Sequence, residues 1–209
     1  MTELEITRRR LLELGLALPP LAALAGAGRS AGSAKASAPV ASLPLAPTPA
    51  IADADDPTPE LTEGPYFTPN SPRRRSIVAA GAAGTRLTLT GRVLTTAGKP
   101  VARALADFWQ CDARGAYDND GYRFRGHQLT DAEGRYTLFS VVPGLYPGRT
   151  RHIHVKVQAP NQPILTTQLY FPGEPGNARD GIYNPVLEMQ FATTDAGANG
   201  QFNFVLQMA

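Results

Sequence analysis

The chain has 209 residues, 43% of them hydrophobic and 18% charged, with a formal net charge of +2. This length is enough to bury one sizeable core. Beyond residue 40 the basic and acidic side chains balance, and no basic patch indicates a nucleic-acid partner. Cys111 is the only cysteine, which excludes an internal disulfide.

The N-terminal segment has the pattern of an export signal. An arginine-rich stretch at residues 7–12 precedes an apolar run at residues 14–27, which a Pro-Pro pair interrupts. The run is too short and too broken to anchor the chain stably in a bilayer. Together with the small-residue tract that contains Ala34-Lys35-Ala36, the pattern resembles a bacterial twin-arginine signal. Residues 1–36 are therefore expected to direct export to the periplasm or the exterior; an ordinary basic amphipathic start is the alternative.

Residues 37–60 are rich in Ala, Pro and Ser and hold few large apolar side chains. Such a segment cannot bury enough surface to offset the entropy lost on ordering, so we expect a flexible, disordered linker. The folded domain is then expected at residues 61–209.

The remaining chain has the pattern of short strands separated by Gly- and Pro-rich turns. Alternating apolar and polar residues predict strands at residues 86–94, 104–110, 135–141, 152–157, 164–171 and 201–207. No convincing long helix is found after Leu61. This pattern indicates an all-β fold, an antiparallel β-sandwich with long loops.

Two of the chain's three histidines lie two residues apart, at His152 and His154. On a strand they share one face with their Cα atoms roughly 6.6 Å apart, so both imidazoles can reach one ion. An isolated His-x-His pair is more often a polar face than a metal site. Here Tyr117 and Tyr146 each follow a predicted strand and complete a set of four candidate ligands.

This donor set favours ferric iron. A tyrosine is normally a neutral phenol with a pKa of about 10, and it becomes a ligand only where a strongly Lewis-acidic cation stabilises the phenolate. Fe(III) is such a cation, whereas zinc and calcium suit two phenolates and two imidazoles much less. No carboxylate stands beside the histidine pair, which speaks against a ferrous site of two histidines and one carboxylate.

With these residues in place, the chain resembles the intradiol ring-cleavage dioxygenases, the family of protocatechuate 3,4-dioxygenase and catechol 1,2-dioxygenase. The resemblance covers essentially residues 61–208. It rests on the ordered motifs Thr62-Glu63-Gly64-Pro65-Tyr66, Gly91-Arg92-Val93, Trp109-Gln110-Cys111-Asp112-Ala113-x-Gly115-x-Tyr117, Thr130-Asp131-x-x-Gly134-x-Tyr136, Val142-Pro143-Gly144-x-Tyr146, Arg149-x-x-His152-x-His154 and Thr167-Gln168-Leu169-Tyr170-Phe171.

The resemblance implies a non-haem Fe(III) centre with Tyr117 and His152 as equatorial ligands and Tyr146 and His154 as the axial pair. Tyr146 would also be catalytic, as the ligand that a catechol displaces and that accepts a substrate proton. Arg149 is the expected second catalytic residue, because a guanidinium stays charged and can stabilise negative charge that develops on the ring. A surface or salt-bridging arginine is the alternative for Arg149.

The resemblance also implies substrate contacts at Gly64, Pro65, Tyr66 and Gln168. The expected partners are a small catecholic substrate and O2, and a homo-oligomer is compatible with the family. Both oxygen atoms would enter the product, and the ring would open between its hydroxylated carbons to a cis,cis-muconate-type diacid. Only two residues separate Tyr146 from Arg149, fewer than in the well-known enzymes, so we expect an open site and a broad range of catechols.

A second interpretation stays open at this point. Gly91-x-Val93 and Thr130-Asp131-x-x-Gly134-x-Tyr136 also resemble transthyretin-like and carboxypeptidase-regulatory-like sandwiches, many of which only bind or scaffold. In such a non-catalytic module the tyrosines and histidines would pack or hold a structural metal. Of the other residues, Trp109 is expected in the core, His127 in a loop, and Arg73-Arg74-Arg75 on a solvated or packing edge.

Overall fold

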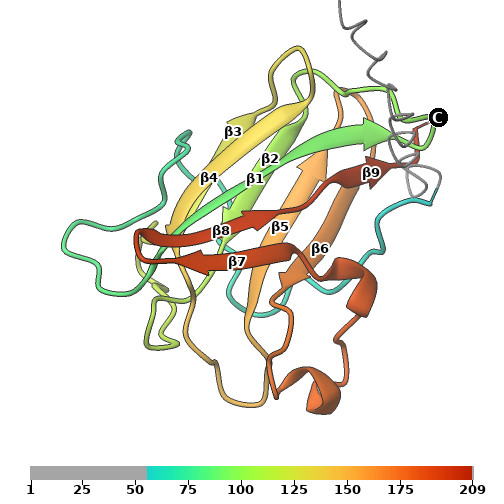
Figure 1. Ribbon diagram of the computed structural model, residues 1–209. Helices are drawn as coiled ribbons and strands as arrows, with labels where there is room; N and C mark the ends of the chain where they lie inside the picture. Colours follow the sequence, from blue (N-terminus) through green and yellow to red (C-terminus); the bar gives the residue numbers. More distant parts are fainter. Residues whose placement is uncertain (1–55, 209) are drawn as a thin grey trace, which may run out of the picture. The chain divides into compact units, whose positions relative to one another are not determined.

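A computed structural model describes residues 56–208 (Figure 1). The expected export signal at residues 1–36 lies outside the described residues, as does most of the expected linker. The strands are β1 (Arg86–Thr95), β2 (Leu105–Trp109), β3 (Arg125–Leu129), β4 (Arg135–Val141), β5 (His152–Gln158), β6 (Ile164–Tyr170), β7 (Gln190–Thr194), β8 (Gly197–Gln201) and β9 (Phe204–Leu206). Two short 3₁₀ helices, η1 (Asn177–Arg179) and η2 (Pro185–Leu187), follow β6. Within residues 56–208 no helix is long and apolar enough to cross a membrane.

The strands form two sheets. One has the order β4-β1-β8-β7, with β9 also paired to β1, and the other has the order β3-β2-β5-β6 (Figure 1). Apolar side chains from both sheets form one core, among them Leu89 of β1, Phe108 of β2 and Val155 of β5. Strand β5 lies between two neighbours, and its first four residues are buried on both faces. One face of β5 therefore contributes to the core and leaves the other face, with His152 and His154, for a buried site.

The all-β sandwich and the six predicted strands are confirmed, with two differences in the sheets. β1 pairs in parallel with β8 and β9, so the first sheet is mixed rather than purely antiparallel. The strand predicted at residues 201–207 is broken at Phe202, whose carbonyl accepts a hydrogen bond from Tyr136. A Cβ at Gly91 would overlap this carbonyl, so the glycine permits the break.

Three strands have no counterpart in the prediction: β3, β7 and β8. Strand β3 is largely polar, so it lacks the alternation that marks a half-buried strand. The sequence context predicted His127 in a loop, and this prediction is wrong, because His127 lies in strand β3. Its Nδ1 atom lies 3.2 Å from the Ser71 hydroxyl, which donates a hydrogen bond to Asp107 at 2.7 Å.

The end of the expected linker is ordered. The Thr58 N–H donates to the carbonyl of Val205 at 2.9 Å, and the Pro59 carbonyl accepts a bond from the Thr167 hydroxyl at 2.7 Å. The Leu61 N–H then bonds to the carbonyl of Thr166 at 2.8 Å. Pro59 and Leu61 thus cover the outer edge of β6, which would otherwise expose unpaired backbone groups. The segment that follows them leads toward the histidine face of β5.

Candidate metal centre

His152 and His154 start strand β5 and are 4% and 3% exposed. Their Nε2 atoms lie 3.1 Å apart. His154 is the register partner of Trp109 on β2 and of Gln168 on β6. The indole of Trp109 stacks on the His154 ring with centroids 4.8 Å apart and an interplanar angle of 9°. The sheet register thus fixes both imidazoles, and Trp109 is buried, as expected, with its ring against a predicted ligand.

The predicted tyrosine ligands come from two loops. Tyr117 lies between β2 and β3, and Tyr146 lies between β4 and β5. Their ring centroids are 5.9 Å apart, and the Tyr117 centroid is 6.3 Å from that of His154. The structure therefore brings together all four side chains that the sequence marked as ligands.

Two glycines allow the tyrosine loops to touch. The Gly144 N–H donates to the Asp112 carbonyl at 2.8 Å, which joins the two loops directly. A Cβ at Gly115 would overlap the carbonyl of Leu145, and a Cβ at Gly144 would overlap the backbone of Gly115. Gly115 also has φ +88°, a conformation that favours glycine. The spacing of the two phenols thus depends on backbone contact between their loops.

The substrate segment expected at residues 64–66 closes over the same cluster. Tyr66 stacks on Tyr117 with centroids 4.3 Å apart, and its hydroxyl donates to the Tyr146 oxygen at 3.3 Å. This bond to Tyr146 raises the pKa of Tyr66, which therefore keeps its proton. Gly64 lies against His154, whereas Pro65 is exposed. Gly64 and Tyr66 therefore contact the cluster directly.

The protonation states of the histidines suit ligands. Burial lowers the pKa of His152 to about 4 and lowers that of His154 well below its usual value, so both rings are neutral near pH 7. The Nδ1 atom of His152 lies 2.6 Å from the Thr150 carbonyl. A carbonyl can only accept, so this nitrogen carries the proton and the Nε2 atom of His152 presents a lone pair.

The donors fit a bound metal. The buried hydroxyl of Tyr117 has no hydrogen-bond partner in the described chain. Two nitrogens bound about 2.1 Å from one ion at a right angle are about 3 Å apart, close to the observed 3.1 Å. Among residues 56–208 no group of three or more His, Cys, Asp or Glu side chains could hold a metal. The available set is thus two phenols and two imidazoles, which suits Fe(III).

Arg149 lies beside this cluster. Its Nη2 atom donates to Gln168 Oε1 at 2.6 Å, and its Nε atom donates to Asp180 Oδ2 at 2.8 Å. Gln168 is fully buried, and its Nε2 atom donates to the Thr62 carbonyl at 3.0 Å. The Arg149 guanidinium is therefore anchored by two side chains. Gln168, which the sequence predicted as a substrate contact, bonds to Arg149 and to the segment that begins at Thr62.

The family described as "Dioxygenase" matches residues 62–208. The chain belongs to the intradiol dioxygenase family. The protocatechuate 3,4-dioxygenase beta chain of Burkholderia cepacia is 37% identical over 123 residues, which cover 50% of this chain and 52% of that protein. The catechol 1,2-dioxygenase of Candida albicans is 32% identical over 148 residues, which cover 57% and 49%. The chain thus spans about half the length of these relatives.

Solved structures of intradiol dioxygenases have the same fold. The dioxygenase domain of a dioxygenase carbohydrate-binding fusion from Streptomyces sp. SirexAA-E is 56% identical with a TM-score of 0.72, covering 74% of this chain and all of that one. The 3-chlorocatechol 1,2-dioxygenase of Rhodococcus opacus 1CP is 28% identical with a TM-score of 0.68, covering 73% of each chain. These matches do not favour the non-catalytic sandwich that the sequence left open.

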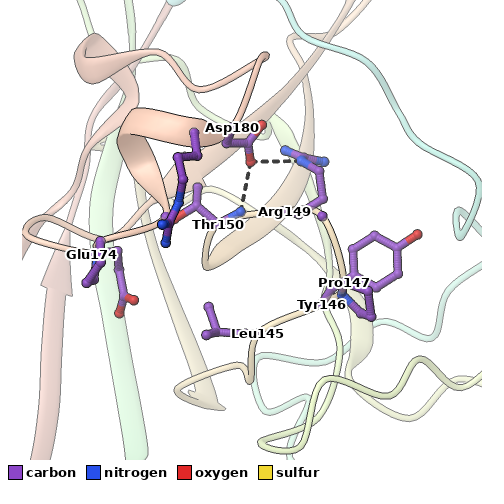
Figure 2. A pocket seen from close by; sticks show the side chains of 11 residues that line it. Leu145, Tyr146, Pro147, Arg149, Thr150, Glu174 and Asp180 are labelled. Atoms are coloured by element: carbon purple, nitrogen blue, oxygen red, sulfur yellow. Dashed lines mark hydrogen bonds and ion pairs between the residues drawn. The ribbon is translucent and has the colours of Figure 1, made fainter.

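A cavity of about 510 Å³ adjoins this site. Residues 145–150 line one side, Tyr146 and Arg149 among them, and residues 174–176, 179 and 180 line the other. Figure 2 shows Arg149 and Thr150 both bonded to Asp180 at its wall. Sequence reasoning missed Asp180, which stands far along the chain from the histidine motif and in none of the quoted motifs. Only the fold places it beside Arg149.

Proposed function

We propose that this chain is a non-haem Fe(III)-dependent intradiol dioxygenase of small catecholic substrates. The observation that carries the proposal is the buried Tyr117 hydroxyl, which has no partner in the described chain. The Tyr117 ring centroid lies 6.3 Å from that of His154, whose Nε2 atom is 3.1 Å from that of His152. A catechol and O2 would give a cis,cis-muconate-type diacid, with both oxygen atoms incorporated and the bond between the hydroxylated carbons broken. Family membership supports the general reaction.

Each residue has a defined part in this proposal. Tyr117, Tyr146, His152 and His154 hold the iron, which, when bound, activates a chelated catechol toward O2. The Tyr146 oxygen accepts a proton from a substrate hydroxyl, and the hydrogen bond that it receives from the Tyr66 hydroxyl at 3.3 Å helps to position it. Arg149 supplies a permanent positive charge where negative charge builds up on the ring.

The open surroundings of the site support a broad range of catechols. Leu145, next to Tyr146, is 56% exposed, and the cavity beside Arg149 extends the space around the site. We infer that ring substituents are tolerated. Rates of O2 uptake with unsubstituted, alkyl-substituted and carboxylated catechols would measure this tolerance; activity with a single catechol alone would contradict it.

Oxygen-isotope labelling tests the reaction itself. The iron-loaded protein is incubated with catechol under ¹⁸O2, and the product is analysed by mass spectrometry. The proposal predicts an acyclic diacid that contains two ¹⁸O atoms. A product cleaved outside the two hydroxylated carbons, or an oxidised ring that remains closed, would overturn it.

We further propose that residues 1–36 direct twin-arginine export of this protein to the periplasm or the exterior. The arginine-rich stretch followed by an apolar run supports the proposal. Export in the folded state suits a protein that acquires its metal before leaving the cytoplasm. Replacing Arg8 and Arg9 by lysine should retain the full-length chain in the cytoplasm. Unchanged export of that variant would contradict the proposal.

A further inference from the structure

Asp180 is a buried carboxylate that the reaction described above does not use. Its side chain is 2% exposed. Oδ2 accepts hydrogen bonds from Arg149 Nε at 2.8 Å and from the Thr150 N–H at 2.9 Å, and Oδ1 accepts one from the Ile182 N–H at 3.1 Å. These bonds hold the pKa of Asp180 below its usual value, although burial alone would raise it. The group therefore lies at the site as a fixed negative charge.

The first contact sets the plane of the Arg149 guanidinium. One nitrogen, Nε, is held by Asp180, and a second, Nη2, is held by Gln168. Two anchors on different nitrogens of a planar group fix its orientation as well as its position. Without Asp180, Arg149 would keep the contacts of its Nη2 atom with Gln168 and Tyr170 but lose the anchor on Nε, so its plane would no longer be fixed.

The second contact reaches a predicted iron ligand through one residue, Thr150. The N–H of Thr150 donates to Asp180, and the carbonyl of Thr150 accepts the proton of His152 Nδ1 at 2.6 Å. Asp180 therefore fixes the residue whose carbonyl orients the His152 ring. Groups that orient a metal-bound histidine in this way tune metal affinity and activity.

The loop that carries Asp180 is held against Thr150 independently. The Thr150 hydroxyl donates to Asn177 Oδ1 at 2.6 Å, and the Asn177 amide donates to the Phe171 carbonyl at 3.0 Å. A Cβ at Gly176 would lie 3.0 Å from the Thr150 hydroxyl oxygen, closer than a side chain normally approaches. Residues 176–180 thus enclose Thr150 from several directions, so the position of the carboxylate is built into the fold.

We propose that Asp180 is a positioning residue that orients both Arg149 and His152, so that a single carboxylate aligns the cation at the substrate and a ligand of the iron. The Arg149 part rests on the proposed function. The His152 part requires only that the chain binds iron.

The test compares Asp180→Asn with a matched control, Asp131→Asn. Asp131 lies in the β3–β4 turn and also accepts two backbone N–H groups, from Glu133 at 3.0 Å and Arg135 at 2.8 Å, and an arginine Nε, from Arg135 at 2.9 Å. Iron affinity of the full chain is measured by chelator competition. We expect Asp180→Asn to lose about 10- to 100-fold in iron affinity and Asp131→Asn to keep wild-type affinity. Equal affinity in both variants would overturn the His152 part.

The Arg149 part is tested with catechol on iron-saturated protein. Asp180→Asn should lower kcat by about 10- to 100-fold with a smaller change in KM. In the Arg149→Ala background the same change should lower kcat by a smaller factor, because one of its two targets is gone. An undiminished effect in that background, or wild-type kcat in the single variant, would overturn this part.

Two further measurements allow the proposal to be tested if the first variant does not fold or the wild-type protein is inactive. If Asp180→Asn does not fold, Asp180→Glu takes its place, because it keeps the charge but displaces it. Asp180→Glu should show the same losses of iron affinity and kcat, each smaller. Wild-type iron affinity and kcat in Asp180→Glu would overturn the proposal. If wild-type protein binds iron but does not consume catechol, the proposed function fails, and the iron affinities still decide the His152 part. The two failures are therefore distinguishable.

Discussion

The Nε2 atoms of His152 and His154 lie 3.1 Å apart, and the Nδ1 proton of His152 is committed to the Thr150 carbonyl. The Nε2 atom of His152 is therefore an acceptor. If the proton of His154 is on Nε2, it can be donated to His152, but the buried Nδ1 atom of His154 is then an acceptor without a partner. If the proton is on Nδ1, that N–H has no partner and the lone pairs of the two Nε2 atoms face each other. A cation between the two Nε2 atoms removes the repulsion of the facing lone pairs, because both then bind it, while the Nδ1 proton of His154 stays without a partner in the described chain.

Tyr117→Phe separates metal binding from packing. The change removes the unpaired hydroxyl but keeps the ring that stacks on Tyr66. We expect the metal-free protein to gain up to about 1 kcal/mol in free energy of unfolding, while iron binding and turnover are lost. Urea unfolding and iron titration measure the two effects. Tyr122→Phe is the control, since Tyr122 bonds to the Pro69 carbonyl and should keep wild-type iron binding. Full iron affinity in Tyr117→Phe would remove Tyr117 from the ligand set.

Gly64→Ala should disturb the histidine site directly. The new Cβ would lie 3.2 Å from His154 Cε1, and Gly64 has φ +72°. Gly173→Ala is a matched control with φ +71° and no heavy atom within 4 Å of the added Cβ. Both changes should cost about 1–2 kcal/mol of stability from backbone strain, but only Gly64→Ala should also weaken iron binding. Equal iron affinity in the two variants would show that this contact has no effect on the site.

Arg149→Ala should retain iron and visible colour but lower kcat by about 10²- to 10³-fold, because the variant loses a charge aimed at the reacting ring and none of the four ligands. Steady-state kinetics and a visible spectrum of the same sample check both statements. Arg135→Ala, which removes an exposed ion-paired arginine, is the control and should keep wild-type kcat. Wild-type kcat in Arg149→Ala would exclude Arg149 from the reaction.

Asp180 should contribute to acid sensitivity. Its folded-state pKa lies below the unfolded value because Thr150 and Arg149 donate to it, against the effect of burial. A carboxyl shifted in this direction stabilises the fold above its unfolded pKa, about 4, and the contribution disappears as the pH falls through the lower folded value. The stability difference between wild type and Asp180→Asn, from urea unfolding of metal-free protein, should therefore be constant above about pH 5 and shrink below pH 4. A difference that grows with acidification would contradict the assignment.

The sequence was informative wherever function required particular residue types at fixed spacing. The alternation over residues 152–157 predicted both the strand and the shared face of His152 and His154, and the observed β5 agrees. Strand β8 was missed because Gly197-Ala198-Asn199-Gly200-Gln201 has little apolar alternation and is specified by its pairing with β1 and β7. Its parallel pairing with β1 joins segments far apart in the chain, which local pattern does not encode.

The supporting contacts of the site were beyond the reach of sequence pattern for the same reason. Tyr117 and Tyr146 were identified from motifs, but the contact of their loops depends on Gly115 and Gly144 meeting in three dimensions. Asp180 reaches Arg149 across a long sequence separation, from a loop whose position depends on Thr150 and Asn177. The sequence motifs suggested the candidate ligands, whereas the groups that orient those side chains became visible only in the fold.

The central claim is tested most directly by the visible spectrum of iron-loaded protein, recorded without oxygen, then with catechol, then after admission of air. Phenolate bound to ferric iron gives a charge-transfer colour. The account predicts a reddish band that shifts when catechol binds and bleaches with oxygen as a muconate-type product forms. A protein that stays colourless after ferric loading, or a band that catechol does not change, would contradict it.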